Sequence, residues 1–197
     1  MELILASQSP RRRELLERMG IRPFRVCSPG VDEDLGEELP PAELVCRLST
    51  RKAEAVQAKA GPDALIIAAD TVVALDGAIL GKPRDEREAF KMLSALSGCR
   101  HQVYTGVTVL WGSRRRTEHE VTDVTFRALE EGEIEDYIST KEPMDKAGAY
   151  GIQGLGALFV EGIQGDYYNV MGLPVCRLGR MLDGLGLHCM RRAAGRG

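Results

Sequence analysis

The stretch ALIIAADTVV, residues 64–73, is a continuous apolar run that reaches a carboxylate and a hydroxyl near its end. Such runs are typical of a β-strand that is covered on both faces, as in the sheets of α/β proteins. In open α/β sheets, ligands gather beyond the carboxyl ends of the strands. Because an unpaired carboxylate inside a core is costly, we expect Asp70 to face either solvent or a cation.

The chain after this strand is predicted to turn back on itself. Asp76 and Gly77 form a pair that favours a two-residue hairpin turn. The turn returns the chain to the sequence GKP at residues 81–83. We therefore expect Lys82 to lie beside Asp70.

The N-terminal segment predicts a strand, a helix and a second strand. Residues 2–6 are a short, mainly apolar run, and residues 23–38 begin as a strand and continue into an acidic loop. Between them, Ser9 and Pro10 are the residue types favoured at the N-cap and at the first helical position. This order of elements indicates an α/β fold.

Three consecutive arginines, residues 11–13, occupy the first turn of that helix. The helix dipole is positive there and disfavours each cation by roughly 0.3–1 kcal/mol. A bound phosphate group would satisfy the free amides, the dipole and the guanidinium groups together. The alternative is a solvated basic turn whose arginines pair with Glu14 and Glu17.

The remaining chain predicts further helices and one long hairpin. The predicted elements are helices over residues 41–59, 86–98 (capped by Asp85), 130–140 and 173–186, and a hairpin over residues 101–129 that turns around Gly112. The glycine-rich segment 142–175 predicts turns and loops that enclose one strand near residues 157–160.

Two basic features have more than one interpretation. Lys52 falls on the apolar stripe of the helix predicted over 41–59, so its ammonium group either reaches water past its neighbours or points into a cleft. The arginines 114–116 lie at the tip of the predicted hairpin and indicate a solvated edge.

Composition excludes several classes of protein. The 197 residues carry 26 Lys and Arg against 29 Asp and Glu, so the net charge of −3 provides no general attraction to nucleic acid. An aromatic content of 5% also argues against a stacking platform for bases. Three scattered histidines do not form a zinc ligand set.

Composition also predicts the compartment. No apolar stretch approaches the length of a membrane span, and the N-terminus lacks the pattern of a signal peptide. Five scattered cysteines fit free thiols in a reducing environment. We expect a cytoplasmic protein with one domain over residues 1–187 and a frayed basic tail over 188–197.

The cations and carboxylates together predict a polyphosphate site. Carboxylates would repel phosphate unless a divalent metal lay between them, so we expect Mg²⁺ to be bound by Glu33, Asp70 and substrate oxygens. The pKa of water lies about 12 units above that of an ordinary aspartate. Asp70 would therefore accept the proton late, after metal and cations have stabilised the developing charge.

Eight segments taken together resemble the signature blocks of the Maf family. They are ASQSPRRRELL, GVDE, RKAEAV, AADTVV, ILGKP, LSGCRHQVYTGV, DKAGAYGIQG and GDYYNVMGLPV, in this order along the chain. The resemblance runs from about Leu3 to Leu187. It implies a Maf/inosine triphosphatase-like α/β fold, in which helices flank a mixed, twisted central sheet that carries a substrate cleft.

The resemblance also implies an activity and a set of site residues. The activity is hydrolysis of a nucleoside triphosphate between its α and β phosphates, with dTTP and UTP as the substrates of the branch that this chain resembles. The implied proton acceptor is Asp70, the implied metal ligands are Glu33 and Asp70, and the implied substrate-binding residues are Ser9, Arg12, Arg13, Lys52, Thr71, Lys82 and Gln153.

The implied cofactor is a divalent metal, with Mg²⁺ expected and Mn²⁺ or Co²⁺ as alternatives, and the implied assembly is a homodimer. Gln153 offers both a donor and an acceptor to the imide edge of a pyrimidine, although a glutamine in a glycine-rich loop also commonly bonds nearby backbone. A different hypothesis is a nucleotide-sensing regulator of septum formation and cell division in which catalysis is not essential.

Overall fold

The computed structural model describes residues 2–32, 34–36 and 38–194. Within them, seven strands form one sheet in the order β2-β1-β3-β5-β6-β7, and β4 pairs with β3 off this path. The chain divides into two compact units. Unit 1 comprises Met1–Asp70, Thr105–Glu120 and Gly172–Gly197, and unit 2 comprises Thr71–Tyr104 and Val121–Met171.

Parallel pairing organises the strands of unit 1. Strand β1 (Leu3–Leu5) runs parallel to β2 (Arg25–Val26) and to the first half of β3 (Leu65–Leu75). All six residues of β3 in unit 1 are buried, as the continuous apolar run predicts for a strand that is covered on both faces. Asp70 is the last of these six.

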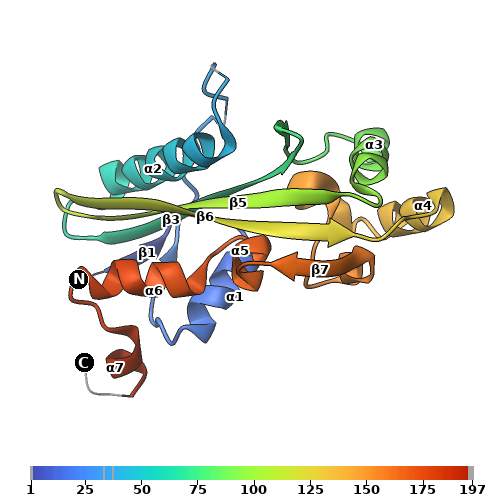
Figure 1. The fold of residues 1–197 in the computed structure, drawn as a ribbon. Coiled ribbons are helices and arrows are strands. Elements are labelled where there is room, and N and C mark those ends of the chain that lie inside the picture. The colour runs from blue at the N-terminus through green and yellow to red at the C-terminus, as the bar shows by residue number, and fades with distance from the viewer. Residues whose placement is uncertain (1, 33, 37, 195–197) are drawn as a thin grey trace. The chain divides into compact units, whose positions relative to one another are not determined.

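Helices cover both faces of the sheet in unit 1. Figure 1 shows α2 (Pro41–Ala60) on one face, and α1 (Pro10–Arg18) and α6 (Val175–Asp183) on the other. The core beneath α2 consists of small and branched apolar side chains: Ile4, Ala6, Ala53, Val56, Ala64, Ile66, Ala68 and Leu110. Small residues allow the helix to lie close to the strands.

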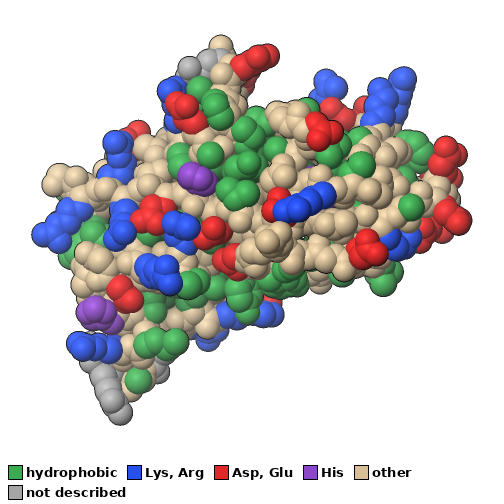
Figure 2. Space-filling view, viewed as in Figure 1, with side chains coloured by type: hydrophobic (Ala, Val, Ile, Leu, Met, Phe, Trp, Pro, Cys, Tyr) green, Lys and Arg blue, Asp and Glu red, His purple; other side chains and the backbone are tan. Residues whose placement is uncertain are grey.

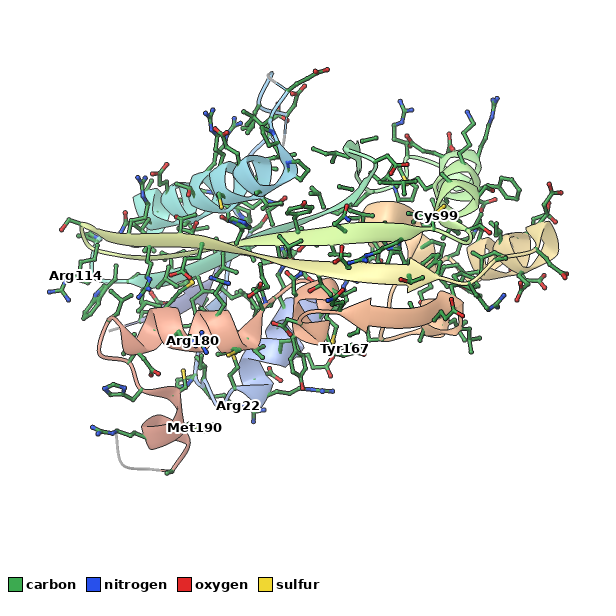
Figure 3. All side chains as sticks on the ribbon, in the orientation of Figure 1. Arg22, Cys99, Arg114, Tyr167, Arg180 and Met190 are labelled. Carbon is green, nitrogen blue, oxygen red and sulfur yellow. The ribbon has the colours of Figure 1, made fainter. Side chains whose placement is uncertain are left out.

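Strands β5 (Arg100–Trp111) and β6 (Arg114–Phe126) are neighbours in the sheet and form the predicted long hairpin. Gly112 takes a φ of 58° in the connecting turn, a conformation that glycine adopts at little cost. Figure 3 shows Arg114 at this turn. The three arginines 114–116 are exposed, which confirms the predicted solvated edge. Arg115 pairs with Glu54 at 2.9 Å and Arg116 pairs with Glu118 at 2.7 Å.

The C-terminal segment of unit 1 contains a short helix, α7 (Cys189–Ala193), inside the region that the sequence predicts to be frayed. Residues 195–197 lie outside the described part of the chain. In the part of the chain that the structure describes, no helix combines the length and the apolar character needed to cross a membrane.

A tight hairpin opens unit 2. Strand β4 (Ala78–Leu80) runs antiparallel to the end of β3, with Val73 opposite Leu80. Asp76 and Gly77 take φ values of 49° and 85°, so the predicted two-residue turn is confirmed. With β1 parallel and β4 antiparallel to β3, the sheet is mixed, as expected.

Unit 2 contains two helices packed on each other, α3 (Glu86–Leu96) and α4 (Glu131–Ser139). The carboxylate of Asp85 accepts a hydrogen bond from Glu88 N at 2.7 Å, which confirms the predicted cap of α3. In Figure 2, acidic side chains gather around α4. The exposed face of this helix carries Glu131, Glu135 and Asp136.

The glycine-rich segment of unit 2 folds mainly into short helices. It contains the 3₁₀ helices η1 (Glu142–Asp145), η2 (Ala147–Ala149) and η3 (Leu155–Phe159), strand β7 (Val160–Gln164) and helix α5 (Tyr167–Met171). The strand predicted near residues 157–160 is therefore misplaced. Residues 155–159 form η3 because the carboxylate of Glu142 binds the amides at its start, and the strand begins only at Val160.

Edge-to-face aromatic contacts form the core of unit 2. The His101 ring lies 4.9 Å from the centroid of Phe126, and its Nε2 atom lies 2.9 Å from the hydroxyl of Tyr150. His101 is fully buried. Burial lowers the pKa of this imidazole from 6.5 to about 4.

Candidate functional site

The first candidate element is the N-terminus of α1 in unit 1. Ser9 is the N-cap, and its side chain accepts a hydrogen bond from Arg12 N at 3.4 Å. Pro10 occupies the first helical position, and the first turn contains no acidic residue. The predicted cap is confirmed, and the positive end of the helix dipole carries basic side chains.

Arg12 is held by the protein. Its Nε atom donates to the carbonyl of Gly172 at 2.8 Å, and its Nη1 atom donates to the hydroxyl of Ser7 at 3.2 Å. Ser7 is buried and also accepts a hydrogen bond from Ser9 N at 3.2 Å. These contacts hold the guanidinium group beside the turn that enters α1.

Arg13 behaves differently, because its side chain is 64% exposed and forms an i, i+4 ion pair with Glu17 at 3.2 Å. Glu14 pairs with Arg18 at 2.6 Å and not with an arginine of the first turn. The alternative of a solvated basic turn thus describes Arg13 but not Arg12. Exposed pairs of this kind contribute about 0–1 kcal/mol, so an anionic ligand can displace Glu17 at low cost.

The second candidate element is a buried ion pair in unit 1. The ammonium group of Lys52, on α2, lies 2.5 Å from Oδ1 of Asp70, on β3. Both residues are only 6% exposed. Lys52 therefore does not extend to water, and Asp70 faces a cation, which was one of its two expected environments.

Close packing of α2 against β5 positions Lys52. A Cβ atom on Gly106 would lie 2.3 Å from the carbonyl oxygen of Val45, so only glycine allows the strand and the helix backbone to approach this closely. One turn of helix further on, the buried hydroxyl of Ser49 lies 2.9 Å from that of Thr108. These contacts join α2 to β5 at the helix positions that precede Lys52.

Unit 2 contains the other predicted substrate-binding residues. Thr71 is half-buried within β3, Lys82 is exposed after β4, and Gln153 is exposed in the turn before η3. The register of β3 and β4 is established from Val73 to Leu75. The placement of Lys82 beside Asp70 stays a prediction.

The predicted metal ligands are placed only in part. Glu33 lies outside the described residues. Within residues 2–32, 34–36 and 38–194, no group of three or more His, Cys, Asp and Glu side chains could hold a metal ion. Mg²⁺ is commonly bound through one or two carboxylates, substrate phosphates and water, so Asp70 fits a metal that arrives with a triphosphate better than it fits an all-protein metal cage.

The sequence reasoning did not identify a second polar cluster, which surrounds the Glu142 carboxylate in unit 2. This carboxylate accepts hydrogen bonds from the hydroxyl of Tyr137 at 2.9 Å, from Leu155 N at 3.0 Å and from Gly156 N at 3.2 Å. Burial raises the pKa of Glu142, but the three donors outweigh it and leave the pKa below its ordinary value. No spacing pattern in the sequence connects Tyr137 and Glu142 to the glycine-rich turn.

The mixed sheet and its helices place this chain among the mixed α/β proteins. The fold of the chain is similar to that of a HAM1 protein from Coxiella burnetii, with a TM-score of 0.52 and 15% identity over 93% of this chain and 99% of that chain. At this identity the similarity concerns the fold alone. It agrees with the mixed sheet and flanking helices that the sequence predicts.

The sequence comparisons are more specific. A family model described as Maf-like protein matches residues 2–185. A protein of Carboxydothermus hydrogenoformans named dTTP/UTP pyrophosphatase is 54% identical over 92% of this chain and 97% of its own. A protein of the same name from Symbiobacterium thermophilum is 51% identical over 98% of this chain and 99% of its own. The chain belongs to the Maf family.

Proposed function

We propose that this protein is a nucleoside triphosphate pyrophosphatase that hydrolyses dTTP and UTP to the nucleoside monophosphate and pyrophosphate. The observation that carries the proposal is identity of 50% or more, over nearly the whole chain, to relatives that are named for this activity. The ion pair of Lys52 and Asp70 supports it, because the ammonium group holds an ionised carboxylate in a defined place in a buried site, where it can accept a proton late in the reaction.

In the proposed reaction, water attacks phosphorus at the anhydride between the α and β phosphates. A new bond forms between the water oxygen and the attacked phosphorus, and the bond from that phosphorus to the bridging oxygen breaks. The two products are the monophosphate and pyrophosphate. Asp70 accepts the proton of the attacking water, and Lys52 orients the carboxylate through its 2.5 Å contact. A divalent metal, when bound, supplies Lewis-acid stabilisation of the phosphate oxygens.

The remaining assignments belong to the same proposal. In unit 1, Ser9, Arg12 and Arg13 bind phosphate at the positive end of α1, which matches the preference of helix N-termini for anions. In unit 2, Lys82 and Thr71 bind the substrate and Gln153 pairs with the base. The metal is Mg²⁺, with Glu33 as a further ligand, and the protein acts as a cytoplasmic homodimer.

Product analysis tests the proposal directly. The purified protein, incubated with Mg²⁺ and a panel of eight nucleoside triphosphates, is expected to release pyrophosphate and monophosphate from dTTP and UTP with the highest kcat/KM. Chromatography of the nucleotides and separate assays for pyrophosphate and orthophosphate identify the products. Release of orthophosphate, or no turnover of any of the eight, contradicts the proposal.

A further inference from the structure

The turn that carries Gln153 is attached to the protein on both of its sides. On the N-terminal side, Gly151 N donates to the hydroxyl of Tyr137 at 3.1 Å. On the C-terminal side, Leu155 N donates to Oε2 of Glu142 at 3.0 Å. Because the hydroxyl of Tyr137 donates to Oε1 of Glu142 at 2.9 Å, one continuous chain of hydrogen bonds spans residues 151–155.

The glycines of this turn permit that attachment. A Cβ atom on Gly154 would lie 2.4 Å from Oε1 of Glu142, and a Cβ atom on Gly156 would lie 2.9 Å from the hydroxyl of Tyr137. Any larger residue would push the backbone away from the two acceptors. The pattern GIQGLG at residues 151–156 is therefore explained by close approach of backbone to a carboxylate and a phenol.

The two side chains that hold the turn are themselves held. Tyr137 is 4% exposed, lies on α4, and packs edge to face on Phe159 with 5.0 Å between ring centroids. Glu142 begins η1, and its carbonyl oxygen accepts a hydrogen bond from Lys146 Nζ at 2.5 Å. The turn thus rests on rigid elements of unit 2, whereas Gln153 itself is exposed.

This arrangement matters for base selection. A glutamine amide carries a donor on one side and an acceptor on the other, and rotation of the amide exchanges them. A free glutamine could pair with uracil in one orientation and with cytosine in the other. A fixed backbone does not stop the amide from rotating, but it sets the distance and direction from which the amide reaches the base, and a turn that moves would let either orientation find a partner.

We propose that Tyr137 and Glu142 are positioning residues for substrate specificity, which fix the turn of residues 151–156 so that Gln153 reaches the pyrimidine from one set position. This inference rests on the proposed function. It predicts that loosening the turn changes the discrimination between UTP and CTP more than it changes the turnover of UTP.

Two variants test the inference. Tyr137→Phe retains the ring but removes the hydroxyl, and Glu142→Gln retains the shape but replaces one acceptor oxygen with a donor group. In each, the ratio of kcat/KM for UTP to that for CTP is expected to fall about tenfold, the size associated with losing one well-placed hydrogen bond. The double variant is expected to be no worse than the more affected single variant, because the two residues act as one unit.

Tyr150→Phe is the matched control. This residue is also a buried tyrosine of unit 2 and directly precedes the turn, but its hydroxyl lies 2.9 Å from Nε2 of His101 and does not take part in the hydrogen bonds that join Tyr137 and Glu142 to the turn. The control is expected to lower the melting temperature to a degree similar to Tyr137→Phe and to leave the UTP to CTP ratio unchanged. An unchanged ratio in both test variants would overturn the inference and reduce the cluster to a structural role.

Hydrogen exchange in the unaltered protein provides a test that does not depend on variants that fold. The amides of Gly151, Leu155 and Gly156 are expected to exchange slowly, and exchange at the rate of an unstructured peptide would overturn the inference. If the unaltered protein does not release pyrophosphate from UTP, the proposed function fails. If it does so and only the ratios stay constant, the positioning role alone fails.

Discussion

Asp70 in unit 1 and Glu142 in unit 2 are two carboxylates that the fold satisfies in opposite ways. Asp70 is 6% exposed and contacts the ammonium group of Lys52. Glu142 is half-buried and accepts hydrogen bonds from two backbone amides and a phenol. One is balanced by a full charge and the other by dipoles.

The difference shows how the same functional group serves two purposes. A buried ion pair loses much of its Coulomb energy to desolvation, so a proton or another cation can alter it. A carboxylate bonded to backbone amides cannot leave without exposing several unsatisfied donors, each of which is costly when buried. The first arrangement suits a group that changes during a reaction, and the second suits a group that holds the chain in place.

The largest expected effect is on catalysis at Asp70. Asp70→Asn retains the shape but cannot accept a proton, so we expect kcat for UTP to fall about 10²–10⁴-fold. Steady-state kinetics checks this, and Asp63→Asn, an exposed aspartate of the same unit, is the control. If the variant still binds nucleotide, loses hydrolysis and retains any effect on cell division, a regulatory role independent of catalysis gains support. Full activity would exclude Asp70 as the base.

The next effect concerns the stability of the ion pair. Lys52→Met leaves the Asp70 carboxylate buried without its cation, and we expect the free energy of unfolding to fall by about 3–5 kcal/mol. Combined with Asp70→Asn, the same substitution is expected to cost much less, because no buried charge remains. Denaturant unfolding of the four proteins measures the coupling. Additive losses would mean that the two groups do not stabilise each other.

The next prediction concerns how the stability of the protein depends on pH through His101, a buried residue of unit 2. The pKa of His101 is about 4 in the folded protein and 6.5 for an imidazole exposed to water, so between these values the unfolded chain binds a proton that the folded chain does not. The contribution of His101 to the free energy of unfolding is therefore complete above pH 6.5, and it decreases by about 3 kcal/mol as the pH falls to 4. Equilibrium unfolding at a series of pH values measures it. His101→Gln is expected to remove this dependence, and the exposed His119→Gln is not.

Glu142 affects the free energy of unfolding at lower pH than His101 does. Its folded pKa lies below the ordinary 4.5, so its contribution to stability is present above pH 4.5 and is lost as the pH falls through the lowered pKa. The same titration, continued below pH 4.5, is expected to be flatter in Glu142→Gln than in the unaltered protein. Equal slopes would show that the amide donors do not favour the ionised form.

The last variant tests the approach of α2 to β5. Gly106→Ala would place a Cβ atom 2.3 Å from a backbone carbonyl, and we expect a loss of about 1–3 kcal/mol in stability together with reduced kcat, because α2 carries Lys52. Gly179→Ala is the control, because a Cβ atom there has no neighbour within 4 Å and the residue lies within α6. Thermal unfolding and kinetics together check this. A stable, fully active Gly106→Ala protein would contradict the close approach.

Local patterns predicted most elements well. The structure has α2 at Pro41–Ala60 against a prediction of 41–59, because the apolar stripe and the entry proline act within a single helix. The caps at Ser9 and Asp85 and the turn at residues 76–77 were also identified, since each depends on neighbours within four positions. The strand predicted near residues 157–160 is wrong for residues 157–159, because η3 depends on a carboxylate thirteen residues before Leu155.

Residue types and short spacings in the sequence were thus sufficient for the α/β class, the buried strand that ends at Asp70 and the basic first turn of α1. These features follow from hydrophobic periodicity and capping, which act over a few residues. Tertiary packing selected which cation meets Asp70 and joined Tyr137 and Glu142 to the glycine-rich turn. Such pairings depend on where separate elements meet in space, and a local pattern holds no information about that meeting.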